Sequence, residues 1–146
     1  MDNNMIEYPI LLVEDNPDDV LITKRAFKKG KIKNRLYTVE NGLEAIKFLQ
    51  REGEYADVPI PSLILLDINM PLMNGFQVLE KIKKDEELRK IPVIMLTTSE
   101  RDVDIEKAYS LGCNSYIVKP VNFQKFLEVI INAQEYWLQV CKVPLK

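Results

Sequence analysis

Five stretches rich in apolar residues recur along the chain, and each is bounded by proline, glycine or polar residues. Branched and aromatic side chains are frequent in them, as is typical of β-strands. In chain order they read YPILLVED from Tyr8, NRLYTVE, SLILLD, IPVIMLTT and SYIVKP. Because most of these runs are nearly continuous rather than alternating, we expect parallel strands that are buried on both faces of a sheet.

Apolar residues recur at helical spacing after each of these stretches, which predicts five helices. The first, NPDDVLITKRAFKKG, opens on a cap-like Asn16 with Pro17 near its first position and ends at Gly30. The others are NGLEAIKFLQREG, closed by Gly53, and the ranges 75–85, 102–111 and 122–140. The polar, proline-broken segment EYADVPIPS predicts a loop. Strands that alternate with helices through right-handed crossovers indicate a doubly wound α/β fold.

Length and composition favour one domain. With 146 residues the chain can bury one substantial core, which we expect over about 8–132, with a C-terminal extension over 133–146. A net charge of −2 gives no reason to bind nucleic acid. No apolar run reaches the roughly 18 residues of a membrane span, and the first residues do not resemble a leader, so we expect a cytoplasmic protein. Cys113 and Cys141 lack metal-ligand or redox spacing and are expected to be free thiols.

The sequence contains no histidine. Catalytic sites of the Ser-His-Asp or Cys-His kind and the common histidine-based zinc sites are therefore excluded. Any histidine chemistry must come from a partner.

Polar residues follow four of the predicted strands at their carboxyl ends, where sheets of this class bind ligands. They are Glu14 and Asp15 after the first strand, Asp67 after the third, Thr97 and Thr98 after the fourth, and Lys119 after the fifth. Convergent carboxylates repel one another unless a cation lies among them. Oxygen-only ligands favour a hard cation. The small number of carboxylates suits Mg²⁺, which keeps several water ligands, better than Ca²⁺, which needs a cage of protein ligands. We therefore expect Glu14, Asp15 and Asp67 to hold Mg²⁺.

The same edge predicts phosphoryl chemistry. The Lys119 ammonium can pair with Asp67 and then with an incoming phosphoryl group, and the Thr97 hydroxyl can donate to the same oxygens. Asp67 would be the nucleophile that forms an acyl phosphate. Taken singly, an aspartate at a strand end is more often a turn former or a helix cap, and Lys119 a solvated strand exit. The joint placement on one edge is what favours the phosphoryl site.

The set LLVEDN, LLDINMPLMNG, VIMLTT and YIVKP resembles the receiver domains of two-component response regulators, from about Tyr8 to Asn132. That resemblance implies a flavodoxin-like sheet in the order 2-1-3-4-5. It also implies that Asp67 is the phosphoacceptor and that Asp15 binds Mg²⁺ directly, beside Asp67 and the backbone carbonyl of Asn69. Glu14 would act through water.

The resemblance extends to switching. It implies Thr97 as the switch hydroxyl, Tyr116 as the rotating aromatic side chain and Lys119 as the cation of the site. Asn69 and Ser99 would control the access of water to the acyl phosphate, and a small Ser99 predicts a modest phosphoryl lifetime with slow self-catalysed dephosphorylation. The chain would act as a signalling protein that takes its phosphoryl group from a sensor histidine kinase.

A narrower likeness points to single-domain regulators that partner phytochrome-like kinases. It rests on EDNPDDVLITKRAF, the long EYADVPIPS loop and the extended tail AQEYWLQVCKVPLK. The apolar residues of the tail either pack on their own domain or build a homodimer contact with the face of the fourth helix, fifth strand and fifth helix. These residues are Tyr136, Trp137, Val140 and Val143.

Two other classes of protein fit this pattern less well. Phosphatases of the haloacid dehalogenase type also phosphorylate an aspartate after a strand, but they need a second aspartate two residues later, where this chain has Asn69. A flavodoxin-like FMN carrier needs glycine, hydroxyl and amide donors in the first strand–helix loop. That loop reads EDNPDD and is acidic.

Overall fold

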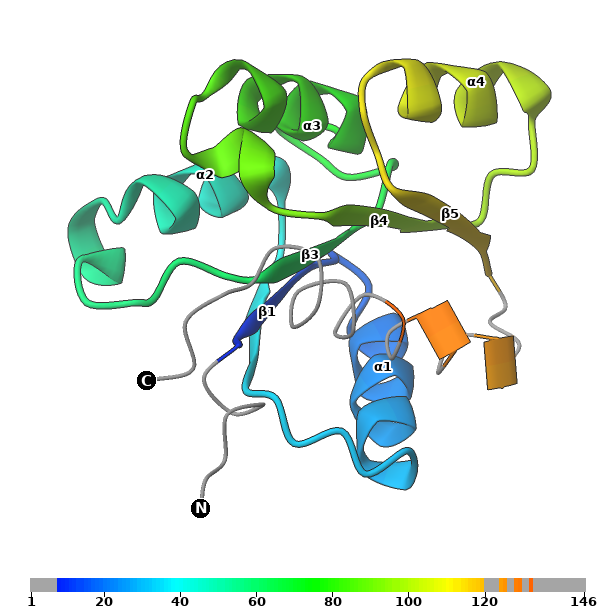
Figure 1. Ribbon diagram of the computed structural model, residues 1–146, viewed down its shortest axis with the longest axis horizontal. Helices are drawn as coiled ribbons and strands as arrows, with labels where there is room; N and C mark the ends of the chain where they lie inside the picture. Colours follow the sequence, from blue (N-terminus) through cyan, green and yellow to red (C-terminus); the bar gives the residue numbers. More distant parts are fainter. Residues whose placement is uncertain (1–7, 120–123, 126–127, 130–131, 133–146) are drawn as a thin grey trace.

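The computed structural model describes residues 8–119, 124, 125, 128, 129 and 132 (Figure 1). Its centre is a five-stranded sheet in the order β2-β1-β3-β4-β5, in which all neighbouring strands are parallel. The strands are β1 (Ile10–Val13), β2 (Leu36–Val39), β3 (Leu63–Leu66), β4 (Val93–Thr97) and β5 (Ser115–Val118). The expected doubly wound sheet and its strand order are confirmed.

Four α-helices lie within the described ranges. They are α1 (Pro17–Lys29), α2 (Gly42–Gln50), α3 (Gly75–Lys84) and α4 (Asp102–Ser110). The Asn16 side chain accepts from the backbone N–H groups of Asp18 and Asp19, so the expected N-cap of α1 is confirmed. The fifth expected helix, over 122–140, lies mostly outside the described residues. The residues described there, 124, 125, 128, 129 and 132, are helical.

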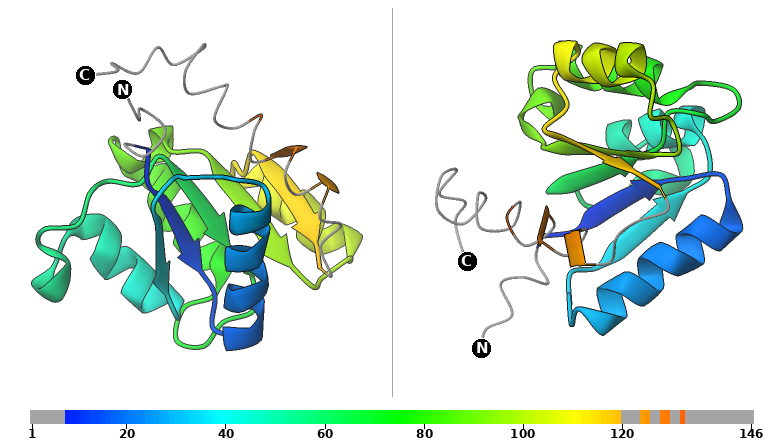
Figure 2. Two further views of the ribbon diagram at one scale, coloured as in Figure 1. Left: turned by 90° about the horizontal axis from the view of Figure 1, so that it is seen from below. Right: turned by 90° about the vertical axis from the view of Figure 1, so that its right-hand side faces the viewer.

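The helices cover both faces of the sheet. Helices α2, α3 and α4 lie together on one face and α1 lies on the other, as the views in Figures 1 and 2 agree. Successive strand side chains point to opposite faces, so each strand contributes to two separate cores. Leu11 and Val13 belong to the core under α2 and α3, whereas Ile10 and Leu12 pack against Ala26 of α1. Burial on both faces explains why the three central strands, β1, β3 and β4, read as continuous apolar runs, whereas the edge strands β2 and β5 are only partly buried.

Some element ends differ from the prediction. The helix expected to close on Gly53 ends at Gln50, because Arg51 adopts the left-handed conformation (φ 56°) and its N–H caps the carbonyl groups of Lys47 and Phe48. The segment predicted as an irregular loop begins within a short 3-10 helix, η2 (Gly53–Tyr55), and a second one, η3 (Leu88–Lys90), precedes β4. Helix ends depend on such local caps, which residue spacing does not reveal.

The strand register brings the polar strand ends to one level. Val13 pairs with Val39 on one side and with Leu66 on the other, so the residues that follow Val13 and Leu66, namely Glu14 and Asp67, lie at the same edge. Thr97 pairs with Val118, the residue before Lys119.

Cys113 is a buried free thiol, as expected, and Cys141 lies outside the described residues. None of the described helices has the length and apolar character of a membrane span.

Candidate functional site

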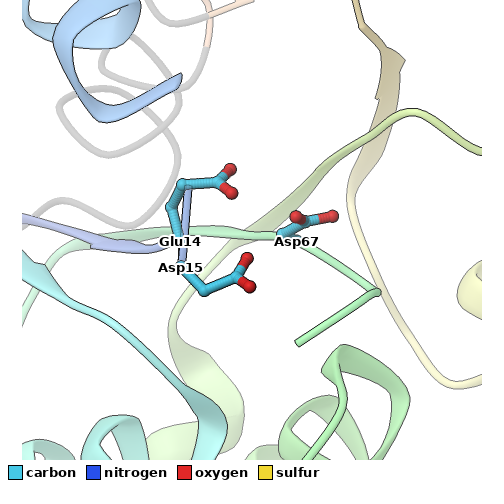
Figure 3. A group of neighbouring side chains, drawn as sticks. All are labelled: Glu14, Asp15 and Asp67. Atoms are coloured by element: carbon cyan, nitrogen blue, oxygen red, sulfur yellow. The ribbon is translucent and has the colours of Figure 1, made fainter. Parts of the chain in front are cut away.

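Three carboxylates meet at the carboxyl edge of the sheet. Glu14 and Asp15 follow β1, and Asp67 follows β3; one oxygen from each lies within 4.8 Å of the others. Figure 3 shows the side chains gathered where the two strands end. Glu14 and Asp67 are buried, whereas Asp15 is exposed to solvent. The predicted convergence of these three residues is therefore present.

Glu14 has an unusual environment for a carboxyl group. Only 3% of the residue is exposed, and one carboxylate oxygen accepts a hydrogen bond from the Lys119 ammonium at 2.6 Å while the other accepts from the Asn16 N–H at 3.2 Å. Burial raises the pKa of Glu14 to about 7, and the Asp67 charge adds to this, although the bond from Lys119 opposes it. Glu14 is thus a group that can change charge near neutral pH.

Lys119 lies at the centre of the site. Its side chain is 8% exposed, and its Nζ lies 2.6 Å from Glu14 Oε1, 2.8 Å from Asp19 Oδ2 and 3.6 Å from Asp67 Oδ2. Burial lowers the pKa of Lys119, but its hydrogen bonds to Asp19 and Glu14 outweigh burial, and the pKa is raised. The predicted pairing of Lys119 with Asp67 is present as the longest of the three contacts.

Asp19 is a site residue that the sequence pattern did not single out. It lies in the first turn of α1, and its side chain is 27% exposed. An acidic residue in a first helical turn is usually explained by the helix dipole, so composition alone gave no signal. Its closeness in sequence to Glu14 and Asp15 was the available signal.

The β4–α4 loop joins Thr97 to Tyr116 through Ser99. Thr97 is completely buried, and its Oγ1 accepts from the Ser99 N–H at 3.4 Å. The Ser99 hydroxyl donates to Asp104 at 2.6 Å, and the Tyr116 hydroxyl donates to the Ser99 carbonyl at 3.0 Å. Tyr116 is partly buried against the core under α2 and α3, and this burial raises its pKa. Hydrogen bonds thus link Thr97 to Ser99 and Ser99 to Tyr116.

The loop after Asp67 is held by the start of α3. The Gly75 N–H donates to the Ile68 carbonyl at 2.8 Å, and a Cβ at Gly75 would lie 2.2 Å from the Asp67 carbonyl oxygen. Asn74 and Gln77 form a capping box that fixes the first turn of α3. The Asn69 N–H donates to the Asp67 side chain at 3.4 Å, and Asn69 itself is exposed. One backbone N–H, that of Asn69, thus contacts the Asp67 carboxylate, and the start of α3 packs against the Asp67 backbone.

A pocket of about 390 Å³ opens beside Glu14 and Asp15. Val20 and Leu21 of α1 and Thr38 at the end of β2 contribute to its wall. Glu14 and Asp15 therefore border an opening between α1 and β2, whereas Asp67 is not among the residues that line it.

The donor set suits a hard divalent cation. Glu14, Asp15 and Asp67 offer only oxygen ligands, their nearest oxygens are close enough to share one ion, and Asp15 is open to solvent. Few protein ligands with room for water match the preference of Mg²⁺. The residues present therefore fit such an ion.

Comparisons with known proteins match this chain along most of its length. A family model described as the response regulator receiver domain matches residues 10–131. Response regulator Rcp1 of Synechocystis sp. is 38% identical over 135 residues, which cover 92% of this chain and 92% of that protein. The match thus extends over both the acidic edge and the two cores.

Solved structures give the same result. The phosphorylated cyanobacterial phytochrome response regulator RcpA matches with a TM-score of 0.78 and 39% identity, over 91% of this chain and 95% of that chain. The Mn²⁺-bound form of response regulator Rcp1 matches with a TM-score of 0.77 and 38% identity, over 90% of this chain and 95% of that chain. The likeness holds in both sequence and fold.

Proposed function

Because this chain belongs to the response regulator receiver family, we propose that Asp67 is its phosphoacceptor and that its donor is the phosphohistidine of a sensor kinase. The observation that carries this proposal is the placement of Asp67 at the end of β3, beside two further carboxylates and 3.6 Å from the Lys119 ammonium. The absence of histidine from this chain is consistent with a donor histidine on another protein.

Asp67 performs the transfer as a nucleophile. One of its carboxylate oxygens forms a bond to phosphorus while the bond between phosphorus and the donor imidazole nitrogen breaks. The departing nitrogen keeps the electron pair, and because the other ring nitrogen carries a proton, a neutral imidazole remains on the kinase. The backbone contact of Gly75 with Ile68 and the close approach of Gly75 to the Asp67 carbonyl fix the backbone that carries this carboxylate. Positioning and electrostatic stabilisation are the main tasks of the protein in such a reaction.

Glu14, Asp15 and Asp67 are the residues that would hold Mg²⁺, with the backbone carbonyl of Asn69 as a further ligand. When bound, the ion neutralises the charge of the carboxylates and of the transferring phosphoryl group. The existence of a Mn²⁺-bound form of Rcp1, a protein similar to this chain, supports a divalent-metal site here.

Lys119 and Thr97 stabilise the product. The ammonium pairs with a phosphoryl oxygen, and the Thr97 hydroxyl donates to another, which draws the β4–α4 loop toward Asp67. Ser99 moves with this loop because it is part of it, and Tyr116 moves because its hydroxyl donates a hydrogen bond to the Ser99 carbonyl. The face formed by α4 and β5 changes as a result, and we propose that partner binding or dimerisation is read out there. The C-terminal part of the predicted dimer contact lies outside the described residues.

The phytochrome response regulators among the similar structures support a phytochrome-like kinase as the donor. Slow self-catalysed dephosphorylation would end the signal, with Asn69 and Ser99 next to the path of the attacking water. The side chain of Ser99 is small, and its hydroxyl already donates a hydrogen bond to Asp104.

Labelling by acetyl phosphate tests the assignment of Asp67. The wild-type protein with Mg²⁺ should gain one phosphoryl group per chain, which intact-mass spectrometry detects as an acid-stable and base-labile adduct. Asp67→Asn should lose the label, because an amide is a poor nucleophile, and chelation of the metal should strongly reduce it. Undiminished labelling in the variant would assign the acceptor elsewhere.

Asp57→Asn is a matched control, because Asp57 is an exposed aspartate in the segment before β3. It should label as the wild type does. Lys119→Ala should still accept some label, since Lys119 does not form the bond to phosphorus, but its partner affinity should no longer respond to phosphorylation.

A further inference from the structure

The hydrogen bonds of Lys119 go to residues other than the phosphoacceptor. The ammonium donates to Glu14 at 2.6 Å and to Asp19 at 2.8 Å, whereas the nearest Asp67 oxygen is 3.6 Å away, beyond hydrogen-bond distance. An ammonium has three N–H donors. Two of them are therefore used by carboxylates that lie on the β1 and α1 side of the site.

Asp19 is fixed in place by its own helix. The Asp19 N–H donates to the Asn16 cap at 3.3 Å, and its carbonyl accepts from the Thr23 hydroxyl at 3.0 Å. Asp19 is not among the three carboxylates that could share a metal ion. Its side chain thus contributes to the site through Lys119, across 100 residues of sequence.

Phosphorylation changes the competition for the ammonium. A phosphoryl group on Asp67 adds a charge of about −1.5 to −2 and strong acceptor oxygens. These oxygens attract the ammonium that Asp19 also binds. The third N–H is not used by Glu14 or Asp19, but the two bonds hold the Lys119 Nζ on the β1 and α1 side of the site, so the ammonium moves away from Asp19 when it approaches the phosphoryl oxygens.

We propose, on the basis of the function proposed above, that Asp19 is a positioning residue that restrains Lys119 and so lowers the stability of the phosphorylated state. Asp19 competes with the phosphoryl group for the position of the Lys119 ammonium. Because the Asp19 side chain is partly exposed, water can solvate it when the ammonium moves away, which keeps the restraint weak enough to be reversed.

An equilibrium measurement tests this restraint, since a rate could change in either direction when the ammonium also stabilises a transition state. Beryllofluoride, a non-covalent analogue of the aspartyl phosphoryl group, would be titrated into the Mg²⁺-loaded protein by isothermal calorimetry. Asp19→Asn should bind it about fivefold more tightly than the wild type, the equivalent of about 1 kcal/mol. Asp19→Glu should restore the wild-type affinity, since it restores the charge that holds Lys119.

Asp18→Asn is the matched control. Asp18 lies in the same turn, its N–H donates to the same Asn16 cap, and it is exposed, so its substitution removes an equal charge without touching Lys119. The affinity of Asp18→Asn for beryllofluoride should equal that of the wild type. In a Lys119→Ala background, Asp19→Asn should give no further change, because the residue that Asp19 acts on is absent.

The outcomes separate this inference from the proposed function. A wild-type protein that neither takes a label at Asp67 nor binds beryllofluoride would overturn both. Normal wild-type labelling and binding, with equal affinities for Asp18→Asn and Asp19→Asn, would overturn the restraint alone. The restraint would also be overturned by an equal gain from Asp19→Asn in the Lys119→Ala background, which would mean a general charge effect.

Discussion

At the scale of single residues, Glu14 links the site to pH. Its pKa is raised from 4.5 to about 7, mainly by burial. Between these two pH values the folded metal-free protein therefore keeps a proton on Glu14, whereas the unfolded chain has lost it. The resulting stabilisation is fully present below pH 4.5 and is lost as the pH rises through 7. Glu14 thereby makes the unfolding free energy fall toward neutral pH.

Glu14→Gln should remove this dependence, because glutamine does not titrate. Chemical unfolding in EDTA between about pH 4 and 8 would compare the wild type with the variant. The free energy of unfolding of the wild type, relative to the variant, should fall by up to about 3 kcal/mol across the window, since one pKa unit corresponds to about 1.36 kcal/mol. A constant difference between the two proteins would contradict the assignment of the proton to Glu14.

A site residue could be predicted from the sequence where it lies directly at the end of a recognisable strand. Glu14, Asp67, Thr97 and Lys119 each follow or end a recognisable apolar run, so the sheet edge brings them together. Asp19 was missed because its role depends on which face of α1 meets the end of β5. That orientation is set by the packing of α1 on the sheet, which the strand pattern does not contain.

At the scale of elements, the start of α3 holds the loop that carries Asp67. Gly75→Ala should destabilise the protein by about 2–3 kcal/mol, because the new Cβ would lie 2.2 Å from the Asp67 carbonyl oxygen and the backbone would have to shift. Labelling of Asp67 should also fall in this variant, because the backbone shift moves Asp67. Urea unfolding and acetyl phosphate labelling would measure the two effects.

Gly53→Ala provides the comparison. Gly53 has a positive φ of 57°, but a Cβ there would have nothing within 4 Å, so only the backbone preference is lost, at about 1–2 kcal/mol. Its labelling should match that of the wild type. If Gly75→Ala also labels normally and unfolds like the wild type, the close approach of α3 to Asp67 has no functional role.

Elements were predictable in kind but less so in their ends. The central strands were recognised because burial on both faces leaves few polar positions in them, and α1 was recognised by its Asn16 cap. The predicted end of α2 was wrong because Arg51, rather than a glycine, adopts the left-handed conformation. Such a conformation in arginine is decided by local hydrogen bonds and not by residue type.

At the scale of the whole molecule, the acidic edge stores electrostatic repulsion that a divalent ion should relieve. Mg²⁺ at about ten times its dissociation constant should stabilise the fold by about 1.4 kcal/mol and raise the melting temperature by about 4 °C. A thermal melt in Mg²⁺ and in EDTA would measure this. The change should be absent in Asp15→Asn and retained in Asp57→Asn.

Asp15→Asn should also raise the stability of the metal-free protein slightly, since it removes one of three neighbouring negative charges. An equal response of Asp15→Asn and wild type to Mg²⁺ would place the stabilising ion elsewhere.

The order of the five strands could be expected only from the resemblance to receiver domains. Apolar runs show that strands are buried but do not reveal which strands are neighbours. Strand order is a property of the whole sheet, because it depends on which way each crossover turns, and no single segment of the sequence carries that information.

The position of Lys119 has a consequence for the order of folding. Its partners Glu14 and Asp19 precede it by 105 and 100 residues, so these contacts close two long loops in the domain. During synthesis the carboxylates of β1 and β3 emerge well before their counter-charge, and the site stays electrostatically incomplete until β5 pairs with β4. A complete site therefore reports that the last strand has docked, and a chain arrested before that step has the acidic edge without its counter-charge.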